Sequence, residues 1–149
     1  LCGEGIVVAN FLAYFPKLKQ YIIAMCSENG NIPVESNWEL EYIYSNGSEM
    51  APPAEHNATI AFLNDSQMAG DTGCNHFFGN FTATDDKLEF NNVGSTRMMC
   101  PQMQFENAFL STIESTASYN ISKDQLVLKD SLGNIIALLK KIEPVAQEN

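Results

Sequence analysis

Gly70-Asp71-Thr72-Gly73-Cys74-Asn75-His76-Phe77-Phe78-Gly79 is the stretch that decides the fold of this chain. Its glycines surround one cysteine and one asparagine, which is typical of backbone that turns sharply and packs closely against a neighbouring segment. A second element, Ser95-Thr96-Arg97-Met98-Met99-Cys100, follows downstream and directly precedes Pro101. Proline suits the first turn of a helix, because its missing N–H would be unpaired there in any case. The second element therefore predicts a helix start.

Short β-strands are predicted on both sides of these elements. Trp38–Tyr44 shows the pattern most clearly, because large apolar residues alternate with polar ones, as in a half-buried strand. Asn46-Gly47 after it is a turn signal. The complete set of expected strands is 38–44, 59–63, 67–70, 77–83, 87–90, 119–122, 125–128 and 135–139.

One helix is expected between these strands, from Pro101 to near Thr116. Its apolar residues recur at helical spacing and form one face, which consists of Met103, Phe109, Leu110 and Ile113. Glu106 and Glu114 are expected on other faces of the helix. About eight short strands and one helix predict an α+β domain, in which a curled antiparallel sheet or partly open β-barrel is covered by the α-helix.

Composition limits the classes of function. The chain has 149 residues and a formal charge of −10, which fits one domain plus a short segment. An acidic surface repels phosphate, so nucleic acid is not an expected partner, and no basic patch is available for anionic lipid headgroups. The four cysteines form no CxxC pair, and His56 and His76 stand in different motifs. We therefore expect no metal site and no cofactor.

Residues 1–34 differ from the rest and resemble a leader or tether. The positive charge of Lys17 and Lys19 precedes a short apolar run that ends at Cys26, as in a bacterial lipoprotein leader, although the run is short for one. Lipidation at Cys26 is one expectation, lipidation at Cys2 is another, and an ordinary N-terminal helix is the third. No apolar run reaches the roughly 20 residues that cross a bilayer. Residues 144–149 are expected to form a tail.

Residues 35–143 resemble the META domain family. The resemblance rests on an ordered set of residues: Trp38, Gly73, Cys74, Asn75, Phe77, Gly79, Thr96, Arg97, Met98, Cys100 and Glu106. Met99 departs from the family, which usually has a small residue there. Many members resemble envelope lipoproteins or secreted proteins, some linked to heat shock. No catalytic residue set is established for the family, so the resemblance implies a non-enzymatic protein.

The resemblance also brings several side chains together. Cys74 and Cys100 lie in the shared motifs and are expected to be near each other, either as a disulfide or as two buried free thiols. Arg97 and Glu106 are expected to form a structural ion pair, with an anion contact as the alternative. His76 is expected to line a turn rather than act as a general base.

Function is expected to be binding. The implied protein faces the periplasm, is lipid-anchored or secreted, and contributes to stress tolerance by binding a partner protein of the envelope. The alternative is a carrier of lipid or another hydrophobic ligand in a groove between helix and sheet. Met98, Met99 and Met103 cluster near the helix start and favour packing or a groove over a soft-metal site.

Overall fold

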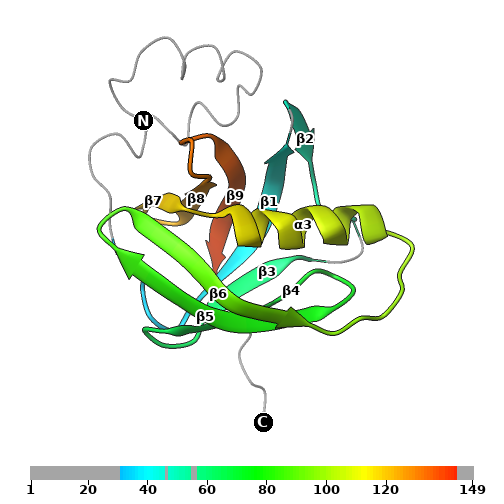
Figure 1. Ribbon diagram of the computed structural model, residues 1–149, viewed down its shortest axis with the longest axis horizontal. Helices are drawn as coiled ribbons and strands as arrows, with labels where there is room; N and C mark the ends of the chain where they lie inside the picture. The colour runs from blue at the N-terminus through cyan, green and yellow to red at the C-terminus, as the bar shows by residue number, and fades with distance from the viewer. Residues whose placement is uncertain (1–30, 46, 55–56, 144–149) are drawn as a thin grey trace.

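The computed structural model describes residues 31–45, 47–54 and 57–143 (Figure 1). The candidate lipidation sites Cys2 and Cys26, most of the predicted leader and the tail lie outside these residues. The elements, in chain order, are β1 (Ser36–Ser45), β2 (Ser48–Met50), β3 (Thr59–Phe62), β4 (Gln67–Asp71), β5 (His76–Thr84), β6 (Lys87–Ser95), α3 (Met103–Ser115), β7 (Ser118–Ser122), β8 (Gln125–Lys129) and β9 (Ile135–Ile142).

The nine strands form one antiparallel sheet that curls into a near-ring. Neighbouring strands follow the order β2-β1-β3-β4-β5-β6-β7-β8-β9, and β1 also pairs with β9. The β1–β9 seam is long and runs from Asn37↔Ile142 to Ile43↔Ala137, with one bulge. The β6–β7 seam is short, because Lys87↔Ser118 is its one paired position. The ring is therefore firmly joined at one seam and barely joined at the other.

The core fills the inside of this near-ring. Alternate residues of β1 point inward, and the indole of Trp38 is fully buried and donates a hydrogen bond from Nε1 to Oγ of Ser36 at 3.0 Å. Aromatic rings from β3 and β5 meet edge to face, with the centroids of Phe62 and Phe81 4.9 Å apart. Such edge-to-face contacts add to the stabilisation that burial of the rings provides.

Helix α3 lies across the sheet and packs against β6 and β1 (Figure 1). Its buried residues are Phe105, Glu106, Phe109, Thr112 and Ile113. The ring of Phe109 meets Phe77 of β5 edge to face at 5.7 Å and stacks on Phe105 at 6.0 Å. Aromatic side chains therefore occupy the space between helix and sheet.

The predicted α+β architecture is confirmed, with differences in detail. The structure adds β2, extends β6 to Ser95, and begins α3 at Met103 instead of Pro101. Glu106 was expected on a face other than the apolar one, but it is buried together with Phe105. Within the described residues, no helix has the length and apolar character needed to cross a bilayer.

Candidate functional site

The loop between β4 and β5 is a tight turn built by its own polar groups. Gly73 has a φ of 97°, a conformation that glycine adopts without strain. Oδ1 of Asp71 accepts a hydrogen bond from the Gly73 N–H at 2.6 Å. The hydroxyl of Thr72 accepts from the N–H groups of Cys74 and Asn75, at 3.2 and 2.9 Å. These bonds fix the direction in which the Asn75 side chain leaves the turn.

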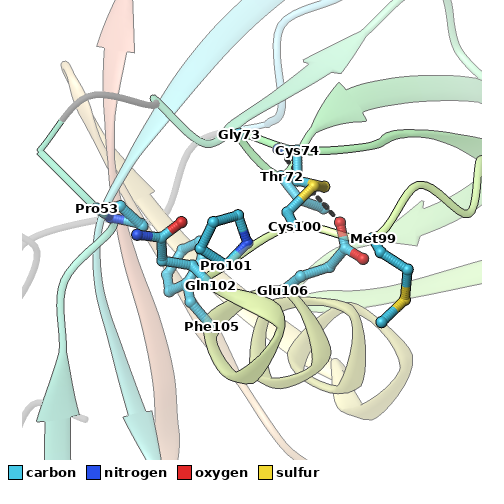
Figure 2. A pocket seen from close by; sticks show the side chains of 10 residues that line it. All are labelled: Pro53, Thr72, Gly73, Cys74, Met99, Cys100, Pro101, Gln102, Phe105 and Glu106. Atoms are coloured by element: carbon cyan, nitrogen blue, oxygen red, sulfur yellow. Dashed lines mark hydrogen bonds between the residues drawn. A yellow bond between two sulfur atoms is a disulfide. The ribbon is translucent and has the colours of Figure 1, made fainter.

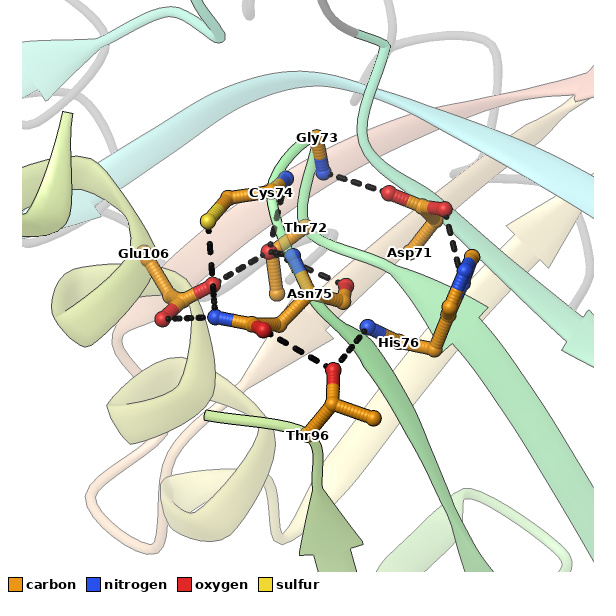
Figure 3. A network of polar contacts seen from close by, with 8 residues as sticks. All are labelled: Asp71, Thr72, Gly73, Cys74, Asn75, His76, Thr96 and Glu106. Atoms are coloured by element: carbon orange, nitrogen blue, oxygen red, sulfur yellow. Dashed lines mark hydrogen bonds and ion pairs between the residues drawn. The ribbon is translucent and has the colours of Figure 1, made fainter. Parts of the chain in front are cut away.

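Asn75 is fully buried, and its amide joins three segments of the chain (Figure 3). Its Nδ2 donates to both carboxylate oxygens of Glu106 on α3 at 2.8 Å and to the carbonyl oxygen of Met98 at 3.0 Å. Its Oδ1 accepts from the hydroxyl of Thr96 at 2.8 Å and from the N–H of Met98 at 2.7 Å. Both polar atoms of the amide are therefore satisfied, as burial requires.

Glu106 is 4% exposed, and both of its carboxylate oxygens accept hydrogen bonds from neighbouring side chains. Besides Asn75, the hydroxyl of Thr72 donates to its Oε1 at 2.6 Å. Glu106 also stands in the first turn of α3, where the helix dipole favours negative charge. The turn, the segment after β6 and the helix are thus held together by one carboxylate and one amide.

A disulfide between Cys74 and Cys100 joins the same turn to the segment before α3. The two Cα atoms are 6.2 Å apart, within the range that disulfides span. Of the two arrangements expected for these cysteines, the structure contains the bond and not a pair of free thiols. The disulfide also touches the Asn75 network, because Nδ2 of Asn75 lies 3.4 Å from Sγ of Cys74.

A cleft of about 270 Å³ opens beside the disulfide at the start of α3 (Figure 2). Its lining is mostly apolar and consists of Pro53, Thr72, Gly73, Cys74, Met99, Cys100, Pro101, Gln102, Phe105 and Glu106. Met99 lies at the edge of the cleft and is 85% exposed. In the wall of the cleft, the Thr72 hydroxyl donates a hydrogen bond to Glu106. The cleft therefore offers an apolar surface whose two buried polar side chains, Thr72 and Glu106, already have protein partners.

The expected ion pair between Arg97 and Glu106 is wrong. Arg97 is exposed, and in the described part of the chain no ion pair joins it to Glu106, whose oxygens are taken by Asn75 and Thr72. His76 lies on the surface, where its Nδ1 is 2.9 Å from Oδ2 of Asp71. No cluster of three or more His, Cys, Asp or Glu side chains suited to a metal ion occurs among residues 31–45, 47–54 and 57–143.

The structure divides the motif residues into three groups. Gly73, Cys74, Asn75, Thr96, Met98, Cys100 and Glu106 build the turn, the network and the disulfide. Trp38 and Phe77 belong to the core, and Gly79 packs so closely on β6 that an added Cβ would lie 2.9 Å from the carbonyl oxygen of Asn91. Arg97 is exposed and belongs to neither group.

The sequence reasoning missed several contributors, among them Gln102 and Phe105 in the lining of the cleft. Thr72 holds both the turn and Glu106, and Pro53 lines the cleft from a distant segment. A threonine followed by glycine and asparagine in a turn is a signal for local side-chain bonds to the backbone. Nothing in the sequence around Pro53 indicates its place.

Comparison with known proteins agrees with this architecture. A protein from Burkholderia xenovorans solved by NMR is similar, with 22% identity, a TM-score of 0.64, and coverage of 78% of this chain and 96% of that chain. A DUF4847 family protein from Bacteroides vulgatus shares 13% identity with a TM-score of 0.54, covering 72% and 92% of the two chains. No curated protein matches the chain. The META domain profile matches residues 31–143, and the chain therefore belongs to the META domain family.

Proposed function

We propose that this META domain protein is a non-enzymatic binding protein of the bacterial cell envelope, which takes an apolar side chain of a partner protein into the cleft beside the disulfide. The observation that carries the proposal is the cleft itself, which combines an apolar lining with the exposed side chain of Met99. Exposed apolar surface beside a small depression is typical of a protein-binding site.

The polar groups at the cleft support binding over catalysis. A catalytic acid or base needs a group that can exchange a proton with a substrate. The carboxylate of Glu106 already accepts hydrogen bonds from Asn75 and Thr72. The imidazole of His76 lies on the surface, beside the carboxylate of Asp71. The network at the cleft therefore has the character of a structural support.

The size of the cleft favours a partner protein over a carried lipid. Pockets for small-molecule ligands usually hold about 300–1,000 Å³. The cleft holds about 270 Å³, and the space between α3 and the sheet is taken by Phe105, Phe109 and Phe77. A single apolar side chain of a partner fits this volume better than an acyl chain.

The proposed location is the periplasmic side of the envelope, with lipid anchoring at Cys26 or Cys2, or secretion. The disulfide supports it, because such bonds form and persist in oxidising compartments. The family resemblance supports a role in stress tolerance. Mass spectrometry of protein isolated from its host membrane tests the anchor, which requires acyl-chain mass on one of these cysteines.

Photo-crosslinking tests the binding site. A photo-reactive residue in place of Gln102, which lines the cleft, should give one discrete adduct in envelope extract. Met99→Glu should reduce its yield at least tenfold, because burying an unpaired charge opposes docking. Leu132→Glu is the matched control, because Leu132 is equally exposed, at 83%, but lies in the β8–β9 turn. Equal yields from both variants, or a small molecule released from the native protein on denaturation, would contradict the proposal.

A further inference from the structure

One wall of the cleft is a short segment that the disulfide holds at its middle. Residues 99–102, here called the rim segment, supply four of the ten residues that line the cleft. Upstream, Met98 is fixed by two hydrogen bonds with the Asn75 amide. Downstream, the carbonyl oxygen of Gln102 accepts from the Glu106 N–H and joins α3. The rim segment is therefore anchored at both ends.

Between these two anchors, the disulfide is the link that holds the rim segment against the β4–β5 turn. Apart from the turn at 101–102 that leads into α3, no backbone hydrogen bond of Met99, Cys100 or Pro101 joins the rim segment to the β4–β5 turn or to another strand among the described residues. The bond from Cys100 to Cys74 is the cross-link that fixes the middle of the rim segment against the β4–β5 turn. Without the disulfide, residues 99–101 would have no link to the β4–β5 turn, and segments held this weakly open at a low cost in free energy.

The fold does not depend on that bond for its local order. The Asn75 amide ties the turn, Met98 and Glu106 together through its own oxygen and nitrogen. Buried and fully satisfied networks of this kind rigidify the segments that they join. Cleavage of the disulfide therefore frees the rim segment while the three segments around it stay in place.

We propose that the Cys74–Cys100 disulfide is a redox-controlled clasp of the cleft: oxidised, it holds the rim segment in the binding shape, and reduced, it releases that segment from an otherwise intact fold. This inference rests on the proposed binding function, whose cleft it regulates. Binding to the reduced protein is weaker, because the partner then has to order the rim segment again.

The chemistry is thiol–disulfide exchange with a protein dithiol. One thiolate of the reductant attacks a sulfur of the bond and forms a mixed disulfide, and the other cysteine leaves as a thiolate and takes up a proton. The second thiol of the reductant then displaces the remaining cysteine, which is also protonated. Two electrons and two protons pass to Cys74 and Cys100, and the reductant becomes a disulfide. Both cysteines are partly exposed at the cleft, which gives the reductant access.

Occupancy and redox state are coupled in both directions. If reduction weakens partner binding tenfold, the bound partner makes the disulfide harder to reduce by the same factor. For a two-electron couple, a tenfold change corresponds to about 30 mV. A partner in the cleft also covers the sulfurs and slows their attack by the reductant.

Backbone NMR relaxation tests the clasp without a partner. In the oxidised protein, the amides of Met99, Cys100 and Gln102 should have order parameters near the rigid value of about 0.85, and after reduction by dithiothreitol they should fall below about 0.6. The amides of Asn75 and Met98 should not change, and the emission of buried Trp38 should stay that of the folded protein. The Cys74→Ser, Cys100→Ser double variant should match the reduced protein and ignore dithiothreitol.

Unchanged order parameters on reduction would overturn the proposal, as would loss of the whole fold. The crosslinking assay at Gln102 adds the binding arm, in which reduction should lower the yield at least tenfold, with a photo-reactive residue in place of Leu132 as control. Equal yields from oxidised and reduced protein would also overturn the clasp. Failure of the oxidised protein to crosslink at all would instead refute the proposed binding function, and the relaxation data would then decide the clasp by themselves.

Discussion

Asn75→Asp changes one atom of the buried network, Nδ2, from a donor into an acceptor. In the protein this atom contacts both oxygens of Glu106 at 2.8 Å and the carbonyl oxygen of Met98 at 3.0 Å. After the substitution all three contacts join acceptors to acceptors. Two carboxylates would face each other where Asn75 is now fully buried.

The size of the effect follows from the less costly of two routes. Two charges 2.8 Å apart repel by about 6 kcal/mol at an effective dielectric constant of about 20. The alternative is one proton shared by the pair. Carboxyl groups ordinarily titrate near pH 4, so holding that proton at pH 7 costs about 4 kcal/mol. We therefore expect Asn75→Asp to lower the free energy of unfolding by about 4 kcal/mol at pH 7.

The pH dependence has a defined sign. Between pH 5 and 7 the folded variant binds one proton more than the unfolded chain, so its stability falls as pH rises. Lowering the pH from 7 to 5 should restore about 2.7 kcal/mol relative to the unsubstituted protein. The opposite slope would show that the new carboxylate finds a donor that the structure does not contain.

Urea unfolding at pH 5, 6 and 7 measures these values, with the fluorescence of Trp38, the chain's single tryptophan, as the signal. The matched control adds Glu106→Gln to Asn75→Asp, so that an amide N–H again meets a carboxylate oxygen across the 2.8 Å contact. The double variant should regain stability at pH 7 and lose the pH slope. A loss below 1 kcal/mol for the single variant at pH 7 would refute the reasoning.

Three further predictions concern other parts of the molecule. Gly70→Ala should cost about 1–3 kcal/mol in urea unfolding, because the added Cβ would overlap the Phe77 ring and a backbone carbonyl oxygen; an unchanged midpoint would contradict the packing. Replacing Cys74 and Cys100 together by serine should cost about 3.5 kcal/mol for a loop with a sequence separation of 26, and a loss under 1 kcal/mol would count against the loop-entropy account. Burial, with the carboxylate of Glu49 beside it, raises the pKa of Tyr44, so stability should fall as the pH rises above about 10, where tyrosines of the unfolded chain ionise, and Tyr44→Phe should make this fall shallower in unfolding experiments from pH 9 to 11.

The strands could be predicted where side chains alternate and not where pairing alone makes them. Trp38–Tyr44 and 125–128 carry the alternation or apolar content of strands and were found. β2 has only Ser48–Met50, mostly polar, and exists because it pairs with the end of β1. The second half of β6 contains asparagine and glycine, which disfavour strands, and is held extended by β5 across a bulge.

The sequence predicted which residues form the candidate site, but not which of them hydrogen-bond to each other. Cys74, Asn75, Cys100 and Glu106 were all singled out, yet Glu106 was assigned to Arg97 because opposite charges suggest a pair. The partner of Glu106 is a neutral amide 31 residues earlier in the chain, which only the tertiary fold brings near. Helical periodicity also placed Glu106 off the apolar face. The structure buries it, because a carboxylate that is fully hydrogen-bonded can be buried.

The long β1–β9 seam sets the order in which the chain can acquire its native structure. Asn37 pairs with Ile142, so β1 cannot complete its pairing until β9, the last strand, has formed. Contacts this distant in sequence slow folding to the millisecond-to-second range typical of all-β proteins. One edge of β1 therefore stays unpaired until the final strand is in place, and a chaperone that covers that edge would protect the chain from aggregation during this interval.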